Sequence, residues 1–189
     1  GGGGDGIYIG VENGSGDNFC NNITIDRVLC KENPRNGISI ISGTNIDITN
    51  CLFIDIGLNG TNNPGIDDHG PFAGIDFEPN VHNEFLQNIS INNCGFESCV
   101  YSGVLFSLQN LTNNSNDISI DITNCSSLNC GRQGLIFEGL RGENINGTIT
   151  IDEFDIYNSN KTGIVVSNWV RGNVLTNISN CNIDNPVSF

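Results

Sequence analysis

Short runs of alternating apolar and polar residues recur along the whole chain, and the runs of a first series each follow a glycine. Alternation places the apolar residues on one face, as in a β-strand buried on one side. The six glycines are spaced 29 to 37 residues apart. The first series of predicted strands comprises residues 6–9, 37–40, 74–78, 103–106, 134–137 and 163–166.

Two further series accompany the first, so each repeat of roughly 30 residues is predicted to hold three short strands. The second series carries isoleucine on one face, and the third contains cysteine or phenylalanine. No stretch shows a 3.6-residue apolar stripe, so no helix beyond a turn or two is expected. The second series lies at 22–25, 45–48, 88–91, 117–120, 147–151 and 177–179, and the third at 27–30, 50–53, 93–96, 124–126, 153–156 and 180–183.

Such short strands bury an apolar face only when successive repeats stack in parallel, about 4.8 Å apart. Asparagine recurs in the turns, where it tolerates the left-handed conformation and can hydrogen-bond its copy in the next repeat. The runs 36–40, 45–51 and 74–80 resemble the coil signature of the right-handed parallel β-helix (pectate lyase-like) superfamily. The resemblance implies an all-β solenoid of about six coils, one domain over 1–189 with a loop insertion at 57–73. It covers nearly the whole chain but does not specify a function, because that superfamily includes both enzymes and fibres.

Registering the first series places residue 76 and residue 78 on the outward face, where Asp76 and Glu78 would be neighbours. Glu138 falls in the column of Glu78, about 9.6 Å away. Paired carboxylates at such separations hydrolyse glycosidic bonds, one as acid and one as base or nucleophile. An equally simple interpretation is that these are solvated acidic side chains of an acidic protein.

The insertion brings further candidates beside this strand, because long loops on rigid scaffolds often carry function. Asp67 and Asp68 are candidate substrate ligands, and His69 is a candidate for proton transfer, for which imidazole is suited near neutral pH. His82, the second of the two histidines, leaves the other end of the strand and is a further candidate substrate ligand. The run of residues 67–70 differs from the polygalacturonase motifs, which belong to separate coils.

Other substrate-binding candidates are Tyr101 and Trp169, which could stack on a sugar, and Arg141, one of the nearest basic residues. No basic residue occupies the outward column, which disfavours a lyase mechanism. No cofactor is expected, although Asp67, Asp68, Asp76 and Glu78 could hold Ca²⁺ through oxygen ligands.

The cysteines recur in the third series and predict an inward ladder in which they act as small apolar residues. Their spacing lacks a zinc signature. Cys99 and Cys130 are 31 residues apart and are the best disulfide candidate if the protein is secreted.

The 189 residues suit one domain, and they include 21 Asp and Glu against 7 Lys and Arg, for a net charge of −14. This charge disfavours nucleic acid and anionic membrane surfaces as partners, and no apolar run is long enough to span a membrane. The start in mid-repeat indicates a mature product or a fragment of a longer protein. Asn59, Asn110 and Asn146 lie in glycosylation sequons, which matter if the chain is secreted.

Two functional hypotheses follow. The first is an extracellular or secreted carbohydrate-active protein, a polysaccharide hydrolase more than a lyase, with a glycan as its partner. The second is a non-catalytic fibre, tailspike or adhesin segment, at a cell or virion surface, that binds glycans or self-assembles. Free ends of a stack are sheet edges that require capping or a partner, so a homo-oligomer or end-to-end assembly is an expected partner arrangement.

Overall fold

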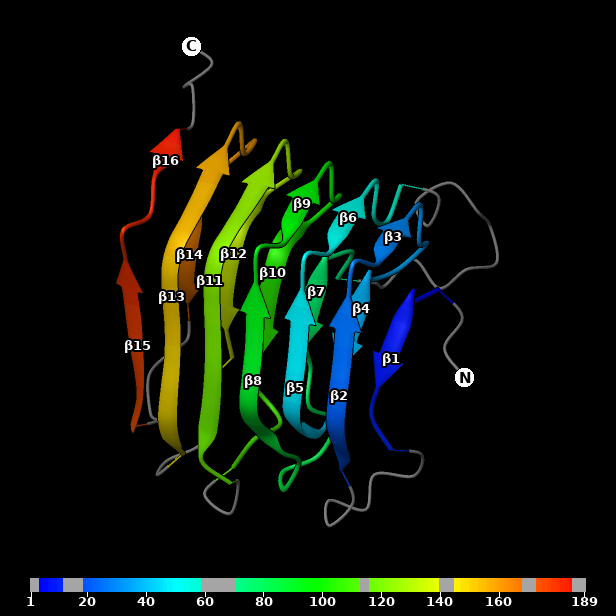
Figure 1. Cartoon of the computed structure of the whole chain (residues 1–189). Coiled ribbons are helices and arrows are strands. Elements are labelled where there is room, and N and C mark those ends of the chain that lie inside the picture. The colour runs from blue at the N-terminus through cyan, green and yellow to red at the C-terminus, as the bar shows by residue number, and fades with distance from the viewer. Residues whose placement is uncertain are drawn as a thin grey trace.

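The computed structural model describes residues 4–11, 19–58, 71–112, 116–139, 145–167 and 173–184, whose regular structure consists entirely of β-strands (Figure 1). Every strand pairing is parallel. One sheet has six strands in the order β1-β4-β7-β10-β12-β14, and it lies behind the larger sheet in Figure 1. Its strands are β1 (Ile7–Ile9), β4 (Ile38–Ile40), β7 (Ile75–Phe77), β10 (Ser102–Ser107), β12 (Gln133–Glu138) and β14 (Ile164–Ser167).

The larger sheet is strongly curled and contains the second and third series of strands. The third series lies above the second in Figure 1, beyond a bend. The second comprises β2 (Cys20–Asp26), β5 (Gly43–Thr49), β8 (Leu86–Asn92), β11 (Ile118–Leu128), β13 (Asn146–Tyr157) and β15 (Asn173–Ser179). The third comprises β3 (Leu29–Lys31), β6 (Leu52–Ile54), β9 (Gly95–Glu97) and β16 (Ile183–Asp184).

In β11 and β13 the second and third series form one continuous strand, where the sequence predicted two. These two strands pair with each other on both sides of the bend: Thr123 with Asp152 before it, and Cys125 with Phe154 after it. The register elsewhere confirms the sequence alignment, since Ser39 pairs with Asp76 and Asp76 with Leu105.

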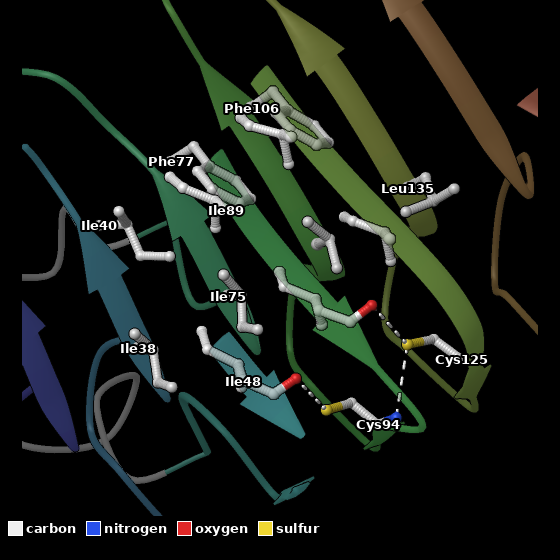
Figure 2. Close-up of a cluster of buried hydrophobic side chains, with 14 of the residues drawn as sticks. Ile38, Ile40, Ile48, Ile75, Phe77, Ile89, Cys94, Phe106, Cys125 and Leu135 are labelled. Carbon is white, nitrogen blue, oxygen red and sulfur yellow. Dashed lines mark hydrogen bonds between the residues drawn. The ribbon is translucent and has the colours of Figure 1, made fainter. Parts of the chain in front are cut away.

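The core lies between the two sheets and repeats the same side chains from strand to strand (Figure 2). Phe77, Phe106 and Phe137 form a stack with ring centroids 4.8 and 4.7 Å apart. Isoleucines of the larger sheet pack against them, and all these side chains are buried. Burial of a side chain of this size stabilises the fold by about 1.5–3 kcal/mol.

The predicted cysteine ladder is confirmed in the middle of the stack, whereas Cys181 at its end is only half-buried. Cys51, Cys94 and Cys125 are 3%, 2% and 4% exposed. Figure 2 shows the Cys94 thiol directed at the carbonyl oxygen of Ile48. The Cys125 thiol likewise lies 3.9 Å from the carbonyl oxygen of Ile91.

The predicted role of asparagine in the turns is also confirmed. Asn45, Asn50, Asn88 and Asn93 have φ between 50° and 55°, the left-handed region that asparagine tolerates better than most residues. Their amides form ladders along the stack: Asn88 Nδ2 donates to Asn45 Oδ1 at 2.6 Å, and Asn93 Nδ2 to Asn50 Oδ1 at 2.7 Å. These bonds fix the bends of neighbouring strands at the same register.

The two ends of the stack differ. The core positions of the first strands are covered, with Ile9 3% and Ile25 8% exposed. The equivalent positions in the last strands are open, with Val166 54% and Ile178 39% exposed. Val166 pairs with Phe137 and so continues the inward column of the first series, and its exposure reflects the open end of the stack. Among the described residues, β14 has a neighbouring strand on one side only, so nothing described covers its other edge.

Candidate functional site: a buried carboxyl cluster

Asp76 occupies the middle of β7, in the column predicted from the sequence, yet its side chain is 0% exposed. It was expected on a solvent-facing surface beside Glu78. The expectation about exposure is wrong because side chains from the turn before β4 and from the end of β7 contact the carboxyl group. These are Asn36 and Glu78.

Asn36 is itself fully buried and joins three neighbouring segments. Its Nδ2 donates to Ser39 Oγ at 3.0 Å and to Asp76 Oδ2 at 3.4 Å. Its Oδ1 accepts from the backbone N–H of Ala73 at 3.0 Å, and its own N–H donates to Asp5 Oδ1 at 3.1 Å. Through its backbone N–H and its side-chain amide together, Asn36 therefore ties the segment before β1 to β4 and β7.

Arg35 supplies the cation of the cluster. One guanidinium nitrogen lies 2.7 Å from Glu78 Oε1, and the other lies 3.4 Å from Asp5 Oδ2. The side chains of Asp5 and Glu78 are only 4% and 19% exposed, so both ion pairs are shielded from water. One arginine thus faces three carboxyl groups, which cannot all ionise without excess negative charge.

A raised pKa of Asp76 relieves that excess, because it favours the protonated acid. Burial raises its pKa well above the usual range, and the charge of Glu78 and a hydrogen bond to Glu78 raise the pKa further, while Arg35 opposes the shift. Asp76 Oδ1 is buried and accepts no hydrogen bond from a fixed donor. As a carboxylic acid, Asp76 can instead donate to Glu78, so the two groups share one proton.

This geometry differs from a glycosidase pair. Retaining enzymes hold their two carboxyl groups about 5–5.5 Å apart, and inverting enzymes still further, to leave room for the sugar or a water. Here the two groups are in hydrogen-bond contact. Glu138 lies at the end of β12 and is separated from Glu78 by Ser107 of β10, as predicted, and it takes no part in the cluster.

Sequence reasoning missed Asp5, Arg35 and Asn36 of this cluster, and also the buried Glu84 in the turn after β7. Glu84 is 2% exposed and accepts from the backbone N–H groups of Asn80 and Val81, closing the turn after β7. Burial raises the pKa of Glu84, and those N–H groups oppose the shift. Burial, then the charge of Glu84, raises the pKa of Tyr8. The sequence offered one signal for Arg35: it lies two residues before the glycine of its strand, and so close to the strand that carries Asp76 in the next repeat.

The remaining candidates do not join the cluster. His82 is exposed in the turn after β7. Tyr101 is half-buried and packs on an apolar cluster of Ala73, Leu105 and Ile136, with the Arg132 guanidinium 4.6 Å from its ring centroid. The packing on one side and the cation limit the ring surface that a sugar could reach. Candidates outside the described residues are Asp67, Asp68, His69, Arg141, Trp169 and Asn59.

The other glycosylation candidates, Asn110 and Asn146, are exposed. Asn110 Nδ2 donates to Pro79 O at 2.9 Å, and Asn146 Oδ1 accepts from Asn173 Nδ2 at 3.1 Å. Glycosylation stays a prediction.

Cys99 and Cys130 lie in contact as two buried thiols. The hydrogen bond to Cys130, together with burial, raises the pKa of Cys99. Ser127 Oγ donates to Cys130 Sγ at 3.2 Å. The proximity is what a disulfide requires, and the disulfide itself stays a prediction.

Among the described residues, no three His, Cys, Asp or Glu side chains gather closely enough to hold a metal ion. The calcium prediction relied partly on Asp67 and Asp68, so it stays a prediction. In the described part of the chain there is also no helix able to cross a membrane. No protein-family model, curated protein or solved structure matches the chain.

Proposed function

We propose that the chain is a right-handed parallel β-helix of about six coils, and that it serves as a non-catalytic structural segment of an extracellular fibre or adhesin. Exclusively parallel pairing supports the architecture, as does the alternation of strands between two sheets. The repeat-to-repeat register supports it further, because equivalent residues of successive repeats lie side by side.

The observation that carries the non-catalytic role is the state of the Asp76–Glu78 pair. Asp76 has no exposed surface, and its raised pKa favours the protonated acid beside Glu78, whose carboxylate is already paired with Arg35. A general acid must come within hydrogen-bond reach of the group that it protonates. The cluster instead braces β1, β4 and β7 from outside the core.

The exposed apolar positions at the last strands favour a segment that meets a partner end to end. Val166, Ile178 and Ile183 continue core columns and are 39% to 54% exposed. Sedimentation velocity over a range of concentrations tests this, and association is expected to weaken when Ile178 is replaced by aspartate.

Incubating the protein with a panel of neutral and acidic polysaccharides tests the main proposal. Reducing-end release detects hydrolysis, and absorbance of unsaturated uronates detects elimination. We expect no turnover. Turnover by the wild type that disappears in Asp76→Asn/Glu78→Gln, with the unfolding transition preserved, would overturn the proposal.

A second candidate is a polysaccharide hydrolase, and the observation favouring it is the raised pKa of Asp76, the property of a general acid beside an ionised partner. In that case Asp76 donates the proton while Glu78 or Glu138 acts as base. The same panel discriminates, because this candidate requires turnover that falls as pH rises and Asp76 loses its proton.

A further inference from the structure

A concave surface lies on the larger sheet, at the bend between the second and third strand series. It is a groove of about 520 Å³, within the usual range for ligand sites. It runs across β9, β11 and β13, where β11 and β13 bend without interruption in Figure 1. Its lining is mostly polar side chains together with the buried Cys94 and Cys125. None of its residues belongs to the carboxyl cluster.

The groove exists because one column of side chains changes size along the stack. The register runs Leu29, Leu52, Gly95, Ser126, Asp155. The two leucines are 58% and 40% exposed and fill the bend in the first two strands of the series. In the next two strands the same position holds glycine and serine, which are too small to fill it. A Cβ on Gly95 would lie 2.9 Å from the Leu52 side chain, so the leucine leans over the groove's end.

The groove presents regularly spaced hydrogen-bonding groups. Asn93 Nδ2 donates along the ladder to Asn50, and Asn180 Nδ2 donates to Asp152 Oδ1, both at 2.7 Å. An amide nitrogen carries two hydrogens, so each retains a second N–H besides the ladder bond. The two asparagines lie three strands apart, so about 14 Å separates these donors.

Carboxylates provide the acceptors. Glu153 takes the asparagine position in β13, and Asp155 follows in the hollow column, accepting from Tyr157 OH at 3.0 Å through one oxygen. A carboxylate accepts from hydroxyl groups through strong, charge-assisted bonds. No lysine or arginine is among the lining residues. The groove therefore repels anions and offers both donors and acceptors to hydroxyl groups.

We propose that this groove binds an extended, uncharged, polyhydroxylated chain, that is, a neutral oligosaccharide. The ligand's hydroxyl groups pair with Asn93, Glu153 and Asp155, and Leu52 supplies an apolar surface for its C–H faces. The groove's length along several strands suits a chain better than a compact molecule. This proposal rests on the charge and polarity of the groove lining alone, so it does not depend on the structural role proposed above.

The test adds neutral hexasaccharides of glucose, mannose and galactose to the whole chain. Binding is monitored by NMR of the asparagine side-chain amides. Ser126→Leu fills the hollow with the residue that Leu52 places naturally in the same column, so the fold tolerates it. The matched control is Ser119→Leu on the other side of the bend. Ser119 pairs with Thr148, and Thr148 pairs with Leu175, so this column also contains a natural leucine. Both serines are exposed.

At least one hexasaccharide is expected to shift the groove amides at about 1 mM ligand. Ser126→Leu should weaken that binding about tenfold or more, while Ser119→Leu leaves it unchanged. The proposal is overturned by any of three results: no shift with any hexasaccharide, binding that survives Ser126→Leu, or tighter binding of an oligogalacturonate or an oligolysine peptide. Turnover in the polysaccharide assay would contradict the structural role and leave this site intact.

Discussion

The outer face of the six-stranded sheet has a polar half and an apolar half built on one column of equivalent positions. Ser39 and Asp76 occupy it in β4 and β7, and Leu105 and Ile136 occupy it in β10 and β12. All four are buried, between 0% and 3% exposed. The polar half is buried in a hydrogen-bonded network and the apolar half under Tyr101. The same backbone register thus accommodates two unrelated ways of covering a sheet, and acidic residues there do not by themselves mark an active site.

Placing a charge in the apolar half should have the largest effect. Leu105→Asp would bury a carboxylate among Ala73, Ile136 and Tyr101, which offer it no cation in direct contact. An uncompensated buried charge costs about 3–5 kcal/mol, so we expect urea unfolding to report a loss of that order. Ser119→Asp, on an exposed strand position, is the control. A loss no greater than that of the control would show that the apolar half is open to water.

Removing the cation of the polar half should have the second-largest effect on stability. Arg35→Met leaves Asp5 and Glu78 without their ion-pair partner in a shielded position. We expect a loss of about 2 kcal/mol in the free energy of unfolding. The matched control is Arg27→Met, because Arg27 also pairs with an aspartate, at 2.8 Å, but is 81% exposed. Exposed pairs contribute little. Equal effects of the two substitutions would contradict the idea of a shielded cluster.

The proton on Asp76 should make stability depend on pH in a definite sense. The folded-state pKa is raised above the unfolded value of about 3.9, so the folded state binds the proton more tightly. This contribution is fully present below the unfolded pKa and is lost as pH rises toward the folded pKa, with a slope of up to about 1.4 kcal/mol per pH unit. Asp76→Asn keeps the shape and a hydrogen-bond donor, so it should abolish this dependence.

Urea midpoints between pH 4 and pH 8 measure the difference between wild type and Asp76→Asn. Asp26 and Asp152 act in the opposite sense. Hydrogen bonds from Asn50 and Thr49 lower the pKa of Asp26, and bonds from Ser179 and Asn180 lower that of Asp152. Their contribution is lost as pH falls, so the comparison must be made between the two proteins and not on the wild type alone. Parallel pH profiles would mean that Asp76 is ionised throughout.

The sequence was sufficient for the strand series and their register because Gly-X-apolar alternation repeats at nearly constant spacing. Asp76 and Leu105 were correctly placed in one column for that reason. Burial of Asp76 was not predictable, since it depends on Asn36, 40 residues earlier, and on the direction of the Glu78 side chain. Alternation also cannot show where a stack ends, since Val166 continues the inward column of Phe137 and yet is exposed in the last strand of its sheet.

The smallest expected effect concerns the cation of the apolar half. Arg132 lies 4.6 Å from the Tyr101 ring centroid, but it is exposed, and an exposed cation–π contact contributes about 0.5–1 kcal/mol. Arg132→Met retains much of the apolar contact with the ring, so its loss should fall at or below this range, smaller than that of Arg35→Met. A larger loss than for Arg35→Met would reverse the comparison. It would mean that the arginine over Tyr101, and not the buried carboxyl network, holds the outer face of the sheet together.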